Sequence, residues 1–104
     1  MTELTVHGVR VPISPDEVSA EIWRALRSGS YEANEARRIA RAIRPGDRVL
    51  ELGAGLGVIT SIIASVDDVR VWSFEADPQT TQLAQRVIEL NCNGNVLLSN
   101  GILA

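Results

Sequence analysis

Apolar and polar residues alternate along the first part of the chain. Apolar residues stand at every second position on both sides of the pair His7-Gly8, from Leu4 to Ile13. Strict alternation is typical of strands with one buried face, and glycine beside a polar residue is typical of a tight turn. The pattern therefore predicts a small β-hairpin, or one strand with a turn in it.

A helical period replaces the alternation after Ile13. Ser14 can serve as an N-cap, Pro15 suits the first helical position, and Glu17 completes a capping box. We expect a first helix from this point to the Ser-Gly-Ser sequence at 28–30.

A second helix is expected over residues 31–43. Ala36, Ile39 and Ile43 recur on one face, which would point to the core. Arginines occupy the other side and the C-terminal end, where cations suit the helix dipole. These are Arg37, Arg38, Arg41 and Arg44. We interpret them as a solvated face and not as an anion site.

From residue 47 onward, short apolar strands alternate with helices. The pattern predicts strands at 48–52, 69–74 and 95–100, and helices at 57–66 and 77–91. Strands that alternate with helices form a parallel sheet with right-handed crossovers. Asp77 would cap the last helix, with Pro78 at its first position. Trp72 and Phe74 would pack in the core.

The fold class that follows is α/β, in a single domain of 104 residues. Residues 1–46 would form the hairpin and the two helices, and residues 47–104 the β-α-β-α-β unit. A chain of this length has room for one core. Its 45% of hydrophobic and 22% of charged residues are typical of soluble globular proteins.

Charge, cysteine content and hydropathy narrow the function classes. The net charge of −3 gives no general attraction for phosphates, so we expect no nucleic-acid partner. Cys92 is the single cysteine, which rules out an internal disulfide and favours a reducing, cytoplasmic location. The longest apolar-rich run, at 58–66, is too short to span a bilayer, so we expect no membrane association. We also expect no metal site.

The segment from Glu51 to Gly57, ELGAGLG, carries the strongest sign of function. It lies between a strand and a helix, where a nucleotide-binding βαβ unit places its ligand. Gly53 permits a tight turn, Gly55 leaves no Cβ in the path of a ligand, and Gly57 lets the helix start against the sheet. Glu75 ends the next strand 22 positions after Gly53, close to the roughly 20 expected for a ribose-binding acid.

The spacing of the glycines discriminates between cofactors. A dinucleotide fingerprint requires a third small residue where this chain has Val58. The observed order, E-x-G-x-G-x-G, resembles motif I of class I S-adenosylmethionine-dependent methyltransferases. A nicotinamide oxidoreductase stays as an alternative, which Val58 disfavours.

Further segments accompany this motif in a fixed order. They are Gly29 with Tyr31-Glu32, the turn Pro45-Gly46-Asp47, Thr60 after the glycine motif, Phe74-Glu75 before Asp77-Pro78, Asn91, and a third strand that ends at Asn100. In order and spacing, these pieces resemble the FkbM family of methyltransferases over about residues 20–104. The resemblance implies S-adenosyl-L-methionine as the methyl donor. It also implies a partial Rossmann-like class I methyltransferase fold.

The resemblance implies cofactor contacts along the glycine motif. Gly53, Ala54, Gly55 and Gly57 would line the methionine and ribose parts of the cofactor. Glu51, at the end of the preceding strand, would lie near its amino group.

The resemblance implies further contacts outside the motif. Glu75 would bind the ribose hydroxyls, Ala76 would flank the adenine, and Asn100 would reach the adenine edge. Tyr31 and Glu32 would cover the methionine end. The catalytic residues are unknown, because in that family the base belongs to segments beyond the third strand.

Compared with that fold, the chain supplies strands 1–3 of the parallel sheet with their helices, and we expect a truncated domain without the acceptor half. Family analogy favours O-methylation of a sugar or other small-molecule acceptor. The free edge of the first strand predicts self-association. The alternative is a non-catalytic S-adenosylmethionine-binding or interaction module that needs a partner.

Overall fold

The chain begins with a short hairpin. The computed structural model describes residues 3–103, and in it β1 (Leu4–Val6) pairs antiparallel with β2 (Val9–Val11). His7 and Gly8 both have positive φ, of 52° and 81°, which is the signature of the two-residue turn that suits strand twist. The predicted hairpin is therefore confirmed.

The first predicted helix is two elements and not one. The capping box of Ser14 and Glu17 closes only a 3-10 turn, η1 (Pro15–Glu17), and Val18 then returns to an extended conformation. Helix α1 (Ala20–Ser28) starts afresh at Ser19, whose side chain accepts a hydrogen bond from the Ile22 amide at 3.1 Å. The predicted start was wrong because the Glu17 carboxylate is also paired with a guanidinium of a distant helix, which holds the turn in place.

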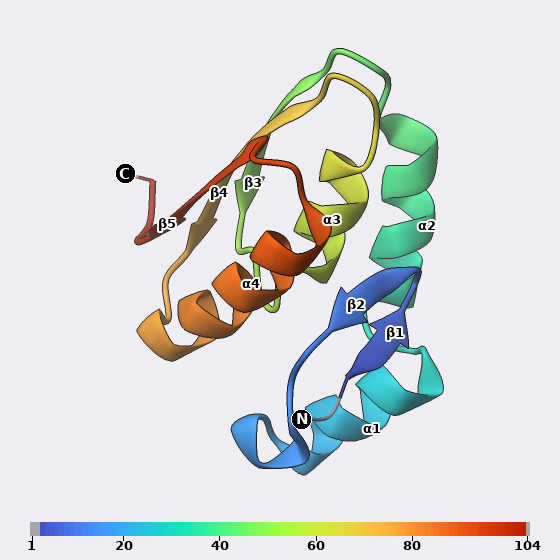
Figure 1. Cartoon of the computed structure of the whole chain (residues 1–104), viewed down its shortest axis with the longest axis vertical. Helices are drawn as coiled ribbons and strands as arrows, with labels where there is room; N and C mark the ends of the chain where they lie inside the picture. Colours follow the sequence, from blue (N-terminus) through green and yellow to red (C-terminus); the bar gives the residue numbers. More distant parts are fainter. Residues whose placement is uncertain (1–2, 104) are drawn as a thin grey trace.

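The remaining elements follow the predicted order. They are α2 (Ala33–Ala42), β3 (Arg48–Leu52), α3 (Val58–Ala64), β4 (Arg70–Glu75), α4 (Pro78–Asn91) and β5 (Val96–Asn100). The three strands form a parallel sheet in the order β3-β4-β5, with Leu52 opposite Phe74 and Glu75 opposite Asn100 (Figure 1). The α/β fold and its parallel sheet are confirmed.

Helix α4 illustrates how local signals set an element. Asp77 caps it by accepting a hydrogen bond from the Thr80 amide at 2.8 Å, and Pro78 occupies its first position, as predicted. Its buried residues form one stripe: Leu83, Ala84, Val87 and Ile88. No helix among residues 3–103 has both the length and the apolar character needed to cross a membrane.

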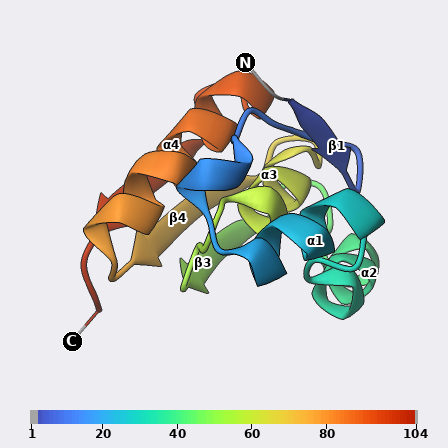
Figure 2. The same ribbon diagram turned by 90° about the horizontal axis from the view of Figure 1, so that it is seen from below.

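Helices α3 and α4 cover the same face of the sheet (Figure 2). Right-handed crossovers that advance in one direction place successive helices on one side, which explains this arrangement. One buried cluster joins the hairpin, α1, α4 and the start of α3, and a second joins α2, α3 and β4. Helix α2 packs against α3.

The other face of the sheet is exposed and apolar. We call it the open face, and it carries Leu50, Leu52, Trp72 and Leu97, with exposed fractions of 54%, 64%, 39% and 61%. Leu50 and Leu97 lie opposite Trp72 in the register, so the side chains stand side by side. The prediction that Trp72 and Phe74 pack in the core was wrong, because alternation points both to the face without helices, where Trp72 is exposed and Phe74 is half-buried.

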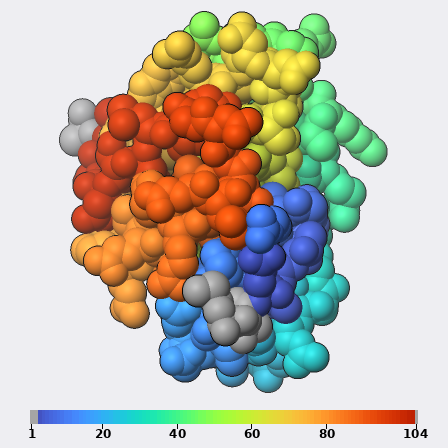
Figure 3. Space-filling model, viewed as in Figure 1, coloured from blue at the N-terminus to red at the C-terminus, as the bar shows by residue number. Residues whose placement is uncertain are grey.

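The hairpin docks on α4 and does not extend the sheet. Asn91, at the end of α4, pairs with the backbone of Arg10: its amide donates to the Arg10 carbonyl at 2.7 Å and its carbonyl accepts from the Arg10 amide at 2.9 Å. The space-filling view shows the N-terminal segment lying against α4 (Figure 3). The N-terminal elements therefore leave the edge of β3 unpaired within the described residues.

Candidate cofactor-binding site

The glycine loop connects β3 to α3 at the carboxyl end of the sheet. Gly53 has a φ of +88°, and both its amide and that of Ala54 donate to the Phe74 carbonyl, at 2.8 and 3.0 Å. A Cβ on Gly53 would meet no atom within 4 Å, whereas Ala54 is buried. Gly53 thus presents bare backbone to open space, which leaves room for a ligand.

The other two glycines of the loop have tighter surroundings. A Cβ on Gly55 would lie 3.3 Å from the Tyr31 hydroxyl. A Cβ on Gly57 would lie 3.1 Å from the Ala84 carbonyl and 3.3 Å from a carbon of Ile88. Gly57 is therefore a point of close contact between the start of α3 and α4.

Glu75 connects the glycine loop to the next crossover. One of its carboxylate oxygens accepts from the Gly55 amide at 2.8 Å and the other from the Asp77 amide at 3.1 Å. The structure therefore brings the glycine loop, through the amide of Gly55, into contact with the acid that stands 22 positions after Gly53. A carboxylate can accept about four hydrogen bonds, so Glu75 retains capacity for two ribose hydroxyls.

A groove of about 350 Å³ opens beside this loop. Its walls come from the carboxyl ends of all three strands: Leu52, Gly53, Phe74, Glu75, Ala76, Gly101, Ile102 and Leu103. In parallel α/β sheets, ligands bind at this edge. Gly53, Glu75 and Ala76, which were predicted to contact ribose and adenine, thus share one groove.

Asn100 supports the wall of the groove. Its amide donates to the carbonyls of Glu75 and Ala76 at 2.9 and 3.1 Å, and to the Thr81 hydroxyl at 3.2 Å. These bonds fix the turn between β4 and α4. They also occupy the donors that the predicted contact with the adenine edge would use.

Glu51 is held by two hydroxyls on the helix side of the sheet. One carboxylate oxygen accepts from Thr60 at 2.5 Å and from Ser73 at 2.6 Å, and both hydroxyl residues are fully buried. The sequence reasoning missed Ser73. Its signal was a lone polar residue at an inward position of an apolar strand.

Tyr31 and Glu32 lie between α1 and α2, over the other side of the loop. Burial raises the pKa of the Tyr31 hydroxyl to about 12, and the charge of Glu32 contributes. Burial also raises the pKa of Glu32, whose Oε1 is buried and has no hydrogen-bond partner in the part of the chain that the structure describes. Glu51 is close enough to add to the raised pKa of Glu32, and the Tyr31 hydroxyl lies beside Gly55.

His7 also belongs to this region, although the sequence pattern predicted only that it lies in the hairpin turn. Its Nε2 donates to the Tyr31 carbonyl at 2.6 Å, although the two residues lie 24 positions apart. The hairpin turn therefore holds the segment that covers Gly55.

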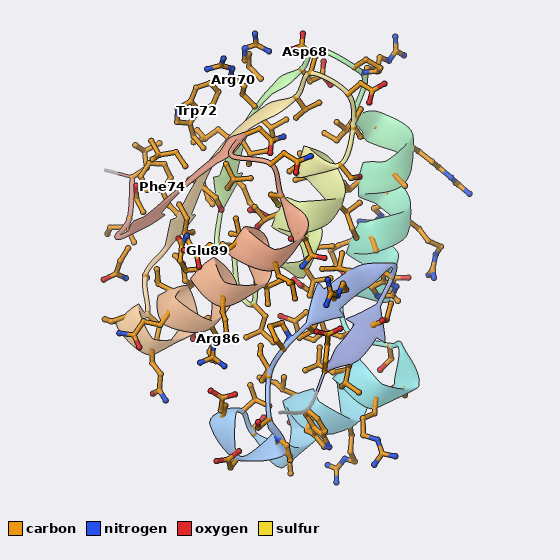
Figure 4. The ribbon with its side chains drawn as sticks, in the orientation of Figure 1. Asp68, Arg70, Trp72, Phe74, Arg86 and Glu89 are labelled. Atoms are coloured by element: carbon orange, nitrogen blue, oxygen red, sulfur yellow. The ribbon has the colours of Figure 1, made fainter. Side chains whose placement is uncertain are left out.

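A larger hollow, of about 650 Å³, lies at the opposite end of the sheet. It is lined by the amino ends of β4 and β5, including Asp68, Arg70 and Trp72 (Figure 4). The glycine loop and Glu75 are absent from its lining. We therefore place the candidate site at the carboxyl end, where the backbone is bare and the acids converge.

Comparison with known protein families decides the class. The family model described as the TRM5/TYW2 methyltransferase domain matches residues 18–101. This chain belongs to the TRM5/TYW2 methyltransferase domain family. The match includes the glycine loop, Glu75 and the segment with Tyr31 and Glu32.

Individual proteins similar to this TRM5/TYW2 domain share 20% to 28% of their aligned residues with it. A ribosomal protein L11 methyltransferase of Bacillus cytotoxicus is 28% identical over 90 residues, which cover 83% of this chain and 29% of the relative. The tRNA (m1A58) methyltransferase TrmI of Aquifex aeolicus is 28% identical over 66% of this chain and 28% of its own, with a TM-score of 0.56. TYW2 of M. jannaschii, solved in complex with AdoMet, covers 95% of this chain and 42% of its own at 20% identity, with a TM-score of 0.72.

Two features of these matches bear on the sequence analysis. The chain spans less than a third of the length of the curated relative, 29%. The class I methyltransferase assignment is confirmed, whereas the comparisons do not support the narrower FkbM family. Cofactor binding and the strand–helix turn require a glycine loop, a strand-end acid and a helix cap in any class I methyltransferase. These features therefore do not distinguish one methyltransferase family from another.

The predicted partners were wrong. A small-molecule acceptor without nucleic acid is contradicted, because the relatives act on tRNA or on a ribosomal protein according to their names. The exclusion rested on a net charge of −3. Net charge averages over the whole surface, whereas a phosphate responds to the local field of one face.

Proposed function

We propose that this TRM5/TYW2 domain binds S-adenosylmethionine in the groove at the carboxyl end of the sheet and presents it for methyl transfer to RNA. The observation that carries the proposal is the meeting of Gly53 and Glu75 at that groove. Open backbone lies on one side of it and a carboxylate with spare acceptor capacity on the other.

The adenosine part fits the wall formed by β4. Glu75 would accept hydrogen bonds from the ribose hydroxyls, and the small side chain of Ala76 leaves a flat surface for the adenine. Asn100 would act by holding this wall, since its amide already bonds the carbonyls of Glu75 and Ala76. We assign it a positioning role.

The methionine part would extend over the glycine loop toward Gly55. Tyr31 would cover it there, because the Tyr31 hydroxyl lies beside this glycine. Glu32 follows Tyr31 directly, and Glu51 is close enough to raise its pKa, so the two acids would supply negative charge that suits an ammonium group and a sulfonium. A cation bound there would offset the unpaired carboxylate oxygen of Glu32.

When bound, S-adenosylmethionine supplies an activated methyl group that an acceptor atom displaces, and positioning of the reactants contributes most of the acceleration. The chain's own residues would hold the donor and shield one side of it. RNA as the acceptor is supported by the family and by the name of the Aquifex aeolicus relative. We also propose a reducing, cytoplasmic location, since Cys92 has no second cysteine to pair with.

A second candidate is a module that binds the cofactor without turnover. It is favoured by one observation: the chain spans 29% of the length of its first curated relative, so the match supports a cofactor site more directly than turnover. The two candidates differ in methyl transfer and agree on cofactor binding.

The test is calorimetric titration of the chain with S-adenosylhomocysteine, with NAD as a control ligand. We expect saturable binding that Glu75→Ala weakens by about 10–100-fold, because hydrogen bonds to a charged group contribute about 1.5–3 kcal/mol. Glu75→Gln retains an acceptor for the Gly55 amide, so it shows whether weaker binding comes from loss of the carboxylate or from a disordered glycine loop. Glu89→Ala, an exposed acid on α4, is the matched control and should bind like the wild type.

Two outcomes would contradict the proposal: no heat from a chain that circular dichroism shows to be folded, or equal binding of NAD. Transfer of labelled methyl groups from S-adenosylmethionine to bulk tRNA then separates the two candidates. Incorporation supports the methyltransferase, and cofactor binding without incorporation supports the module.

A further inference from the structure

Four exposed arginines lie along the outer side of α2. Arg37, Arg38 and Arg41 belong to the helix and Arg44 follows its end. They lie opposite the side that packs on α3 through Ala36. Long side chains with nitrogen ends project from α2 away from the sheet (Figure 4). We call this surface the arginine stripe.

The arginine stripe is not neutralised within the described structure. The two ion pairs found among residues 3–103 join Arg10 to Glu3 and Arg86 to Glu17, and neither involves the stripe. The guanidinium of Arg37 bonds the amide oxygen of Asn34, a neutral partner.

Acidic residues near α2 form no ion pair with the stripe among residues 3–103. Glu35 lies in the first turn of the helix, and its charge contributes to the raised pKa of Glu32. Asp47 accepts the backbone amide of Arg44 and so closes the turn after the helix. The helix itself therefore carries three arginines against one acid, although the whole chain is negative.

The helix dipole accounts for only part of this charge. Cations gain from the dipole within the last turn, where Arg41 lies. Arg37 and Arg38 precede that turn, so their stabilising interaction with the dipole is small. An unpaired row of guanidinium groups has a second use, because their planar donors match phosphate oxygens.

The position of the stripe relates it to the candidate site. Helix α2 starts directly after Tyr31 and Glu32, of which Tyr31 lies beside Gly55, and runs away from the groove toward the other end of the sheet (Figure 1). Within the helix, from Arg37 to Arg41, the rise amounts to about 6 Å. That length matches about two nucleotide steps of one strand, at roughly 3.4 Å each.

In place of the solvated face that the sequence pattern indicated, we propose that the arginine stripe binds the phosphate backbone of the RNA acceptor and so orients the RNA toward the cofactor groove. The choice of RNA rests on the proposed function. The stripe contacts phosphates and not bases, so it contributes affinity and orientation without reading sequence.

The test measures binding of fluorescein-labelled bulk tRNA by anisotropy between 50 and 200 mM salt, roughly the range in which phosphate contacts weaken strongly. The variant is Arg38→Gln with Arg41→Gln. Neither side chain forms a hydrogen bond or ion pair with a described residue, and glutamine has a similar helix propensity, so the fold should be retained. The matched control is Arg24→Gln with Arg27→Gln, which removes the same charge from exposed positions of α1.

We expect the α2 variant to bind tRNA more weakly and to lower the slope of log affinity against log salt by about 2, since each phosphate contact contributes about 0.9. The α1 control should keep the wild-type slope. Equal losses in both variants, an unchanged slope in the α2 variant, or no tRNA binding by the wild type would each overturn the proposal. The last result would direct attention to a protein acceptor.

S-adenosylhomocysteine binding by the same variants separates the two proposals. The stripe residues are absent from the groove lining, so both variants should bind this ligand like the wild type. Normal ligand binding with unaltered tRNA binding would overturn the stripe alone. Absence of ligand binding in the wild type would count against the proposed function.

Discussion

Tyr31 is the single tyrosine of the chain, which makes its ionisation directly measurable. Burial raises its pKa to about 12, so the folded chain holds the phenol proton more tightly than the unfolded chain does. We predict a midpoint near that value in the absorbance titration of the native protein, against about 10 in denaturant.

The raised pKa of Tyr31 also determines how the stability of the fold changes with pH. Because the folded pKa lies above the unfolded value, the free energy of unfolding falls as pH rises from about 10 toward the folded pKa. Tyr31→Phe should lose less stability over this window. A native titration midpoint equal to the denatured one would show that the hydroxyl is not buried over Gly55.

Gly57 offers a second prediction at this scale. Gly57→Ala places a Cβ 3.1 Å from the Ala84 carbonyl in a residue with a φ of +82°. Left-handed backbone alone costs about 1–2 kcal/mol for alanine, and the contact adds to it. Gly94→Ala is the control, since Gly94 has a φ of +80° and nothing within 4 Å. Thermal unfolding should show the larger loss for Gly57→Ala, and equal losses would contradict the close packing of α3 on α4.

At the scale of elements, the Asn91 side chain links α4 to the hairpin. Asn91 gives two hydrogen bonds to the Arg10 backbone, and each such bond contributes about 1 kcal/mol. We predict that Asn91→Ala lowers the free energy of unfolding by roughly 2 kcal/mol, as measured by urea denaturation. Asn91→Asp keeps the acceptor and loses the donor, so its free energy of unfolding should lie between those of the wild type and Asn91→Ala.

Asn93→Ala is the control for this measurement, because Asn93 is exposed and lies just beyond the same helix. Its stability should stay within about 0.5 kcal/mol of the wild type. If Asn91→Ala behaves in the same way, the hairpin is held by its apolar contacts alone.

Local capping signals predicted α4 correctly, whereas Ser14 misled because the pairing of Glu17 with Arg86 joins residues far apart in sequence.

For the whole molecule, the helices cover one face of the sheet and the open face stays apolar. We predict that the dye ANS binds there, and that Leu50→Thr with Leu97→Thr lowers its fluorescence. Both side chains are more than half exposed, and threonine suits strands, so the melting temperature should change little.

Leu90→Gln controls for this effect, because Leu90 is an exposed apolar residue of α4 outside the open face. It should leave dye binding unchanged. Similar fluorescence in the double variant and the wild type would show that the dye binds elsewhere and that the open face is not the main apolar surface.

Much of the fold and of the site followed from sequence alone. The strands, α4, the hairpin turn and the pairing of Gly53 with Glu75 depend on alternation, capping and turn residues, which act between neighbours or across one βαβ unit. Tertiary structure alone decided the exposure of Trp72, the packing of Gly57 on Ala84, the supporting role of Asn100 and the unpaired state of the arginine stripe. Each of these depends on which distant segment lies opposite a side chain, and a linear pattern does not specify that neighbour.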